Sequence, residues 1–172
     1  MATTGNIKKT MEKLKFPQEV IAKMEFDGME HDPVFAVIEK MDELLTEEQR
    51  YAVMERLGCC KSGKRDKDCK EFAELYKNRS FNEKLGLIKN VQYMADNRLN
   101  DDGTLSIFMG CIGMKNNAGC SCGGVKNQKN PVSITYCGCC GGHFRYHYQN
   151  ALGIKLKLIK IKPGEFVYKI VD

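Results

Sequence analysis

Residues 139–171 read CCGGHFRYHYQNALGIKLKLIKIKPGEFVYKIV and carry the clearest structural signals of the chain. A helix is predicted from about Cys139 to Leu152, because the following Gly153 is the residue type that most often ends a helix. From Ile154 onward, apolar residues alternate with lysines, which is typical of a strand with one buried face. The stretch therefore predicts a helix that is followed directly by a half-buried strand.

The alternation after this helix contains one irregularity and one turn. The apolar positions change phase at Ile159 and Ile161, which predicts a bulge or bend in the strand. Pro163 and Gly164 then predict a turn into a last strand over residues 165–171. A helix followed by a hairpin indicates an α+β arrangement with an antiparallel edge.

Helix signals dominate the first hundred residues. Thr46 with Gln49, and Ser80 with Glu83, match the capping box that begins many helices. Apolar residues near these signals recur at helical spacing and are interpreted as core. The sequence therefore predicts a helical section over residues 1–100.

A turn-rich segment at residues 97–103 separates this section from the rest, and residues 104–109 predict a short strand after it. The predicted fold is α+β. The helical section 1–100 packs on a small, mainly antiparallel sheet with one principal C-terminal helix, which belong to a cysteine-rich section at 101–172. We expect one compact unit, because 172 residues is an ordinary length for a single domain.

The composition is that of a globular protein, with 42% hydrophobic and 28% charged residues. No apolar run reaches the roughly 18 residues needed to span a bilayer, and the N-terminus lacks the apolar core of a signal peptide. We therefore expect a cytoplasmic protein with no membrane partner. In a reducing cytosol, clustered cysteines favour metal binding or catalysis over disulfides, and the odd count of nine excludes complete pairing.

The net charge of +5 is unevenly distributed. Residues 104–172 hold nine Lys or Arg against two Asp or Glu, which gives +7, and residues 1–103 hold eighteen against twenty, which gives −2. The basic part could attract a small anionic ligand or nucleic acid. Its lysines mostly alternate along a predicted strand, as on a solvated sheet face. Because no aromatic-rich RNA motif or DNA-binding helix is visible, nucleic acid is the disfavoured partner.

Five cysteines lie within 21 residues, as Cys120-x-Cys122 and, fourteen residues later, Cys137-Gly-Cys139-Cys140. Two short loops with this spacing offer four thiolates, which can close a tetrahedron around zinc. The predicted ligands are Cys120, Cys122, Cys137 and Cys140, since the last two have the two-residue spacing common in zinc sites. An iron–sulfur cluster would also accept four thiolates and is the less favoured cofactor.

Glycines flank this block, and we expect them to let the backbone turn tightly around a small object. They are Gly119, Gly123, Gly124, Gly138, Gly141 and Gly142.

Cys139 is left over as a spare thiol, and it supports an alternative function. At the start of a helix, backbone N–H groups favour a thiolate. His143 lies one turn later on the same face and could act as its general base. The alternative to a metal-binding protein is therefore a small-molecule hydrolase or thiol-redox enzyme that uses Cys139 as nucleophile, or water activated at an open position of the zinc.

His147 and Arg145 follow on the same helix. His147 shares a face with His143, so the two imidazoles could bind metal, assist a thiol or form ordinary polar surface. Arg145 could bind a carboxylate or phosphate, and could equally be solvated. We expect these side chains near the mouth of a pocket for a small anionic ligand.

The remaining cysteines carry weaker signals. Cys59, Cys60 and Cys69 follow no metal-ligand spacing and are interpreted as structural rather than functional. Cys111 suggests no role. The segment from Gly58 to Arg65 resembles a phosphate-binding loop, but it follows a predicted helix, and Arg65 stands where Ser or Thr would bind magnesium. ATP binding is therefore rejected.

Residues 135–171 also resemble a known family. A cysteine-led helix from Cys140 to Gly153, and a hairpin that ends with Gly164-Glu-Phe-Val-Tyr-Lys-Ile170, are similar to the C-terminal part of 4-vinyl reductase small-molecule-binding domains and aminothiazoline-carboxylate hydrolase-like proteins. The resemblance implies a pocket for a small molecule. The acidic Gly-Asp turn and following cysteine of those families are replaced here by Lys162-Pro-Gly-Glu165. The whole chain also looks like a cysteine-rich prokaryotic family.

Overall fold

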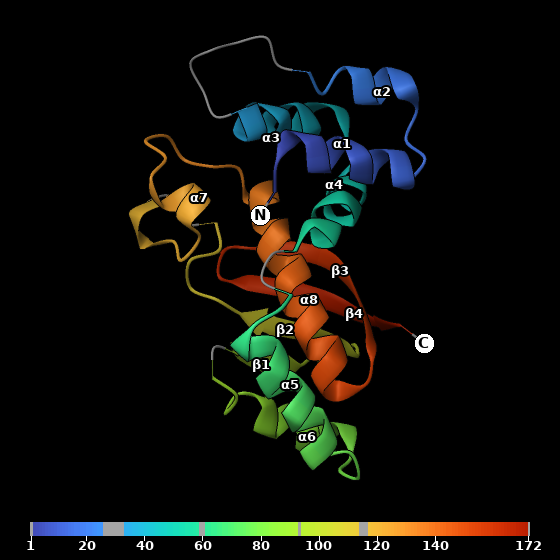
Figure 1. Cartoon of the computed structure of the whole chain (residues 1–172), viewed down its shortest axis with the longest axis vertical. Coiled ribbons are helices and arrows are strands. Elements are labelled where there is room, and N and C mark those ends of the chain that lie inside the picture. Colours follow the sequence, from blue (N-terminus) through green and yellow to red (C-terminus); the bar gives the residue numbers. More distant parts are fainter. Residues whose placement is uncertain (1, 26–32, 59–60, 93, 114–116, 172) are drawn as a thin grey trace.

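The structure is a computed structural model that describes residues 2–25, 33–58, 61–92, 94–113 and 117–171. Its N-terminal half is helical (Figure 1). In chain order the helices there are α1 (Thr4–Lys13), α2 (Gln18–Ala22), α3 (Pro33–Leu44), α4 (Glu47–Met54), the 3-10 helix η1 (Glu55–Leu57), α5 (Lys64–Leu75) and α6 (Phe81–Ile88). Within the described ranges, no helix is long and apolar enough to cross a membrane.

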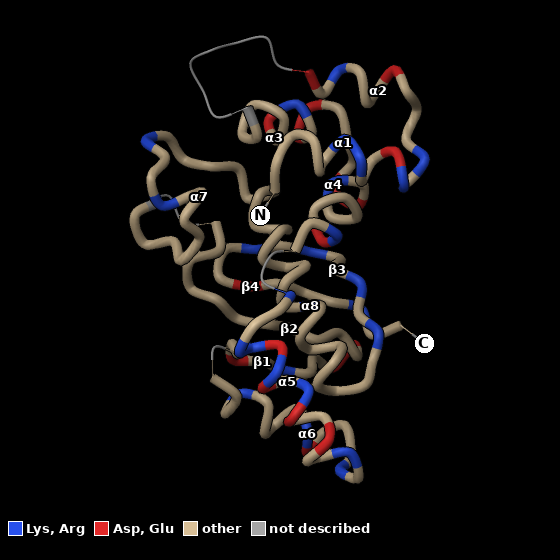
Figure 2. The backbone as a smooth tube through the Cα atoms, in the orientation of Figure 1, with Lys and Arg blue, Asp and Glu red and all other residues tan. Residues whose placement is uncertain are grey.

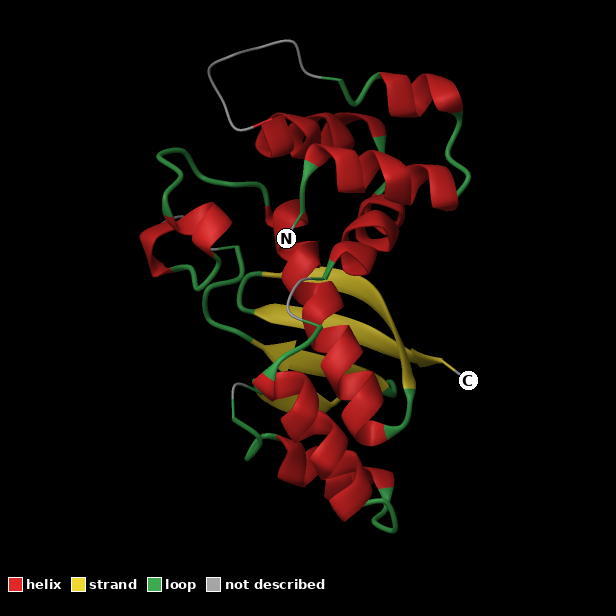
Figure 3. Cartoon of the chain, viewed as in Figure 1, coloured by secondary structure: helices red, strands yellow, loops and turns green. Residues whose placement is uncertain are grey.

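The C-terminal half combines a sheet with one long helix. Its elements are β1 (Asp96–Leu99), β2 (Thr104–Phe108), η2 (Asn117–Gly119), α7 (Gly123–Lys126), η3 (Ile134–Cys137), α8 (Gly138–Leu152), β3 (Lys155–Lys162) and β4 (Glu165–Val171). The four strands pair antiparallel in the order β1-β2-β4-β3. Helix α8 lies across one face of this sheet (Figure 3). The predicted α+β fold with one principal C-terminal helix is confirmed.

Strand β1 was not predicted, because the sequence indicated only turn residues there. Residues 96–99 pair with β2, and the turn residues that follow close a hairpin. The N–H of Asn100 donates to the carbonyl of Thr104 at 2.8 Å, and Gly103 takes a φ of 77° that favours glycine. A short, polar edge strand has no alternation of apolar residues. These residues form a strand because they pair with β2, and that pairing leaves no pattern in the sequence.

The predicted irregularity in β3 is confirmed as a β-bulge. The pairing of β3 with β4 shifts between Leu158 and Lys160, so that Ile159 is the extra residue. Ile161 then returns to the core opposite Phe166.

The outer edge of β3 is occupied by side chains from helices. Three of its backbone N–H groups donate to such side chains instead of to another strand. The pairs are Leu156 with Gln149 Oε1 at 2.7 Å, Leu158 with Glu55 Oε2 at 2.9 Å and Ile161 with Tyr51 Oη at 3.3 Å. Exposed edge N–H groups recruit further strands, so these contacts close an edge that would otherwise be available for pairing.

Two clusters of buried apolar residues meet along α8. One lies between α8, α5, α6 and the sheet, and includes Tyr148 and Phe166. The other lies among α1 to α4 and reaches α8 through Tyr136 and Cys139. Helix α8 therefore connects the N-terminal helices to the sheet, with its first turn in one cluster and its last two turns in the other.

The glycines at the start of α8 make close packing possible, rather than a turn around a small object. Gly138, Gly141 and Gly142 all lie inside the helix. A Cβ on Gly142 would overlap the carbonyl oxygen of Glu55, and a Cβ on Gly138 would lie 2.6 Å from Cβ of Met54. The expectation for these three glycines was wrong, because η1 and α4 pack against the backbone of α8 itself.

Four buried tyrosines predict that the fold is lost in alkali. Burial raises the pKa of Tyr51 to about 12, and it also raises the pKa values of Tyr136, Tyr148 and Tyr168 above the ordinary value of 10. A raised folded pKa gives stability that is complete below pH 10 and is lost as the pH rises through 10 toward 12. We expect circular dichroism and tyrosinate absorbance to change together above pH 10. The chain has seven tyrosines, so ionisation of more than three of them near pH 10 without unfolding would contradict this.

Candidate functional site

Four cysteine thiols gather where three loops meet beside the first turn of α8. Cys111 follows β2, Cys120 and Cys122 precede α7, and Cys137 ends η3. All four are half-buried and none forms a disulfide. Figure 1 shows the loop that carries α7 next to the N-terminal end of α8.

The other three thiols affect the pKa of the Cys137 thiol. Burial raises its pKa to about 11, and a hydrogen bond from the backbone of Gly113 lowers it. Three neighbouring thiols raise it further, in the order Cys120, Cys111 and Cys122. Cys111 and Cys120 are hydrogen-bonded to each other, and Cys137 lies within electrostatic range of both and of Cys122. We call Cys111, Cys120, Cys122 and Cys137 the thiol cluster.

A backbone hydrogen bond favours the thiolate of Cys120 by lowering its pKa, whereas its hydrogen bond with Cys111 raises that pKa and favours the thiol. The N–H of Cys122 donates to Sγ of Cys120 at 3.4 Å. The thiols of Cys120 and Cys111 are hydrogen-bonded to each other, and the Tyr136 side chain is hydrogen-bonded to the thiol of Cys122. Backbone N–H and hydroxyl donors of this kind surround sulfur ligands in metal sites, where they orient the ligands.

Among the described residues, the thiol cluster does not form a metal-binding geometry. Among the residues that the structure describes, no three His, Cys, Asp or Glu side chains already stand in a group that could hold a metal ion. Burial is the main effect that raises the pKa of Cys120, as it is for Cys137, which indicates protonated thiols. Metal binding would therefore deprotonate the thiols and draw the loops together.

The predicted ligand Cys140 lies on the sheet side of α8. It packs against the cluster of buried residues next to the sheet, and its charge would affect the pKa of the deeply buried Tyr168. Its role as a metal ligand stays a prediction. Sequence reasoning gave no role to Cys111, because it lies nine residues before Cys120 and outside any short ligand motif. Strand β2 ends beside the cysteine loops, and only this placement brings Cys111 into the cluster.

The predicted nucleophile and base are both buried. Cys139 is 3% exposed, and its Sγ donates to the carbonyl of Leu57 at 3.3 Å. His143 is 5% exposed, and its Nε2 contacts Nη1 of Arg65 on α5. A substrate could reach either atom only if η1 or α5 moved away from α8. The catalytic roles of Cys139 and His143 stay predictions.

Arg145 forms an ion pair with Glu55. Its Nη1 is 2.8 Å from Oε1 of Glu55, whose other oxygen accepts from the N–H of Leu158. Burial raises the pKa of Glu55 even though Arg145 acts to lower it. The ion pair therefore links η1, α8 and the edge of β3. Anion binding by Arg145 stays a prediction.

His147 is fully buried between α8 and α5, with its ring 4.5 Å from that of His143 between centroids. The neighbouring Tyr146 donates its hydroxyl to Oδ1 of Asp66 on α5 at 3.0 Å. These contacts place both histidines inside a polar contact between the two helices. Ligand binding by His147 also stays a prediction.

The cysteines of the N-terminal half are Cys59, Cys60 and Cys69. Cys59 and Cys60 lie outside the described residues. Cys69 is buried in α5 with its Sγ 4.0 Å from Sδ of Met94, and burial raises its pKa to about 11. A raised pKa makes a thiol inert at neutral pH, which agrees with the structural interpretation of Cys69.

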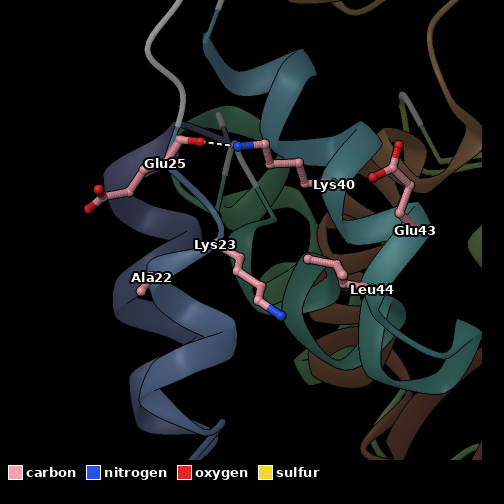
Figure 4. Close-up of a pocket in the computed structure, with 6 residues that line it drawn as sticks. All are labelled: Ala22, Lys23, Glu25, Lys40, Glu43 and Leu44. Atoms are coloured by element: carbon pink, nitrogen blue, oxygen red, sulfur yellow. Dashed lines mark hydrogen bonds between the residues drawn. The ribbon is translucent and has the colours of Figure 1, made fainter.

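Two pockets lie away from the predicted site residues. One of about 420 Å³ lies between α2 and α3, where the Lys40 side chain donates to the carbonyl of Glu25 (Figure 4). The other, of about 490 Å³, lies between α5 and α6 and exposes Leu75. Neither is lined by the thiol cluster or by the predicted residues of α8. The small-ligand pocket expected there stays a prediction.

Comparisons of the chain with protein-family models, curated proteins and solved structures gave no match. The functional argument therefore rests on the chain's own residues and their chemistry.

Proposed function

We propose that the protein binds one zinc ion through the thiolates of the thiol cluster, Cys111, Cys120, Cys122 and Cys137. The observation that supports this proposal is that four half-buried thiols lie on three neighbouring loops, with Cys111 hydrogen-bonded to Cys120 and the N–H of Cys122 donating to Sγ of Cys120. Zinc prefers four sulfur ligands in a tetrahedron, and structural zinc sites are commonly built from separate loops. Three of these ligands are those expected from the cysteine spacing, and Cys111 takes the place of Cys140.

The donors around the cluster support a thiolate site. The N–H groups of Cys122 and Gly113 both donate to cysteine sulfur atoms. Such donors offset part of the negative charge of a four-thiolate zinc site. Free buried cysteines that served only as small apolar groups would not need them.

The ion would hold the cysteine loops to the fold. The described residues between β2 and α8 form only the short helices η2, α7 and η3, and Cys137 directly precedes α8. A bond network from Cys111 to Cys137 would tie the end of β2 to the start of α8. Because such a site forms only in the folded chain, zinc binding would add to the free energy of unfolding.

Metal content tests the proposal. Protein purified without oxygen or added metal is expected to contain one zinc per chain by elemental mass spectrometry, with four thiols protected from alkylation. Replacing Cys111, Cys120, Cys122 or Cys137 with Ser is expected to remove the zinc and lower the melting temperature. Cys69→Ala is the matched control, because it removes a buried thiol away from the cluster and should leave zinc bound.

Two other results would exclude the site or change its fourth ligand. Protein without metal and with every thiol of the cluster reactive would exclude the site. If Cys140→Ser removes zinc while Cys111→Ser retains it, the fourth ligand is Cys140, as the spacing first indicated.

A further inference from the structure

The bulge in β3 places four lysines on one face of the sheet. Before the bulge, buried leucines alternate with Lys155 and Lys157. An unbroken period of two would then turn Lys160 and Lys162 toward the core. The extra residue Ile159 reverses the phase, so that all four lysines lie on the face opposite α8. We call this side of the sheet the outer face.

The other strands extend the positive charge. Lys169 of β4 lies directly opposite Lys157, and Arg98 projects from β1 on the same side. The outer face carries six cations and two carboxylates, a balance of +4: Lys155, Lys157, Lys160, Lys162, Lys169 and Arg98 against Asp96 and Glu165. Two lysines directly opposite each other cost stability. Figure 2 shows the lysines of β3 as blue segments along that strand.

Two of these lysines have carboxylate partners of their own, and Lys162 also helps to lower the pKa of the nearby Asp102. Glu165 accepts from Ser106 and lies 3.4 Å from Lys162. Lys157 pairs with Glu48 at 2.7 Å, but Glu48 is 76% exposed. An exposed ion pair of this kind contributes little to stability, so an anionic ligand can displace it at small cost.

An aromatic ring lies on the same face. Phe108 of β2 is half-buried, and the guanidinium of Arg98 lies over its ring at 5.4 Å from the centroid. Val167 and Ser106 lie at the centre of the face and are both buried. Phe108 lies at one end of the face, directly opposite Asp96 and Glu165, and Glu165 is paired with Lys162. A row of lysines that leads to an aromatic ring can bind a phosphate backbone and stack a base.

The closed edge of β3 excludes one competing partner. An acidic protein segment that added a strand there would need the edge N–H groups, which already donate to Gln149, Glu55 and Tyr51. A partner must therefore contact side chains on the outer face.

We propose that the outer face binds single-stranded nucleic acid without sequence preference, through the lysines of β3 and β4 and the ring of Phe108. Alternating lysines alone favoured a solvated strand. The bulge, the opposed Lys157 and Lys169 and the stacked Arg98 are the observations that favour a binding face. Four-stranded antiparallel sheets with helices on one side bind single strands on the other in this manner. The proposal does not depend on zinc binding.

Fluorescence anisotropy with a labelled oligodeoxythymidylate of about 20 nucleotides tests the proposal. The double variant Lys157→Gln/Lys169→Gln is expected to weaken binding about tenfold at low salt and to reduce the slope of log K against log salt by about 1.4, since each lost contact contributes about 0.7. Phe108→Leu is expected to weaken binding roughly tenfold while it keeps the apolar volume.

The matched control is Lys67→Gln/Lys77→Gln. It removes the same charge from exposed lysines near α5, each paired with a neighbouring glutamate, and should change affinity little. Equal weakening by both double variants, or no binding of the oligonucleotide at low salt, would overturn the proposal. Poly-glutamate that competes as well as the oligonucleotide, together with no effect of Phe108→Leu, would overturn it in favour of an acidic protein partner.

Discussion

Gly142→Ala is expected to be the most destabilising single methyl group in the chain. The added Cβ would overlap the carbonyl oxygen of Glu55, and the three nearest atoms are all backbone atoms of Glu55. Backbone cannot rotate away as a side chain can, so α8 and η1 must separate. We expect a loss of about 3 kcal/mol or more in the free energy of unfolding, at the upper end of the usual cost of overpacking.

A second glycine in a helix provides the control. Gly86 lies in α6, and a Cβ there would meet no atom within 4 Å. Gly86→Ala is expected to stabilise the protein by about 0.5–1 kcal/mol, because alanine loses less backbone entropy on folding. Urea denaturation of both variants measures the difference. Equal small effects at the two positions would show that η1 does not pack on the backbone of α8.

Arg145→Met is expected to cost about 3–5 kcal/mol, because it leaves the Glu55 carboxylate buried without its cationic partner. Glu55 is 6% exposed, and burial already raises its pKa. A group with a raised folded pKa gives stability that is present below its unfolded pKa and lost as the pH rises through the folded value. Without Arg145 the pKa of Glu55 rises further. The variant is therefore expected to lose more stability at pH 7 than at pH 4.

A surface ion pair and a double variant complete this test. Arg79 and Glu83 form an exposed pair at 3.0 Å, so Arg79→Met should cost less than about 1 kcal/mol. Glu55→Gln/Arg145→Met keeps an oxygen for the N–H of Leu158 and removes both charges, and it should recover part of the loss. Denaturation curves at both pH values supply the comparison. An Arg145→Met cost that is small and independent of pH would contradict the ion pair.

The parts of the fold that follow from local chemistry could be predicted from the sequence. Gly153 takes the left-handed conformation at the end of α8, and both predicted capping boxes are present. The change of phase at Ile159 corresponds to the bulge. Each of these signals involves residues close in sequence, where spacing alone determines the geometry.

Features that depend on distant partners could not be predicted. The strand at residues 96–99 is polar and becomes a strand only because β2 pairs with it. Gly142 was predicted inside the helix, but its close packing against Glu55, far away in sequence, has no local signal. Cys111 belongs to no short motif, and its thiol meets that of Cys120 only through the path of the chain after β2. The candidate site was therefore predicted in three of its four proposed ligands.

The histidines of α8 show the same limit. Helical spacing correctly indicated that His143 and His147 share a side, and their rings are in contact. Spacing could not reveal that this side faces α5, where Arg65 and Asp66 supply charge from another helix. Two histidines one turn apart on a helix are thus as compatible with a polar contact between helices as with a pocket.

The side chains that occupy the edge of β3 have a consequence for aggregation. They come from α4, η1 and α8, so that edge is protected only while these helices remain docked. The β3–β4 hairpin is rich in β-branched and aromatic residues, and a detached hairpin of this kind would offer three vacant N–H groups to another molecule. A partly unfolded chain that keeps its hairpin but releases α4 is thus the species from which fibrils would grow. The docked helices would therefore protect this protein from fibril formation, because they cover the edge of β3.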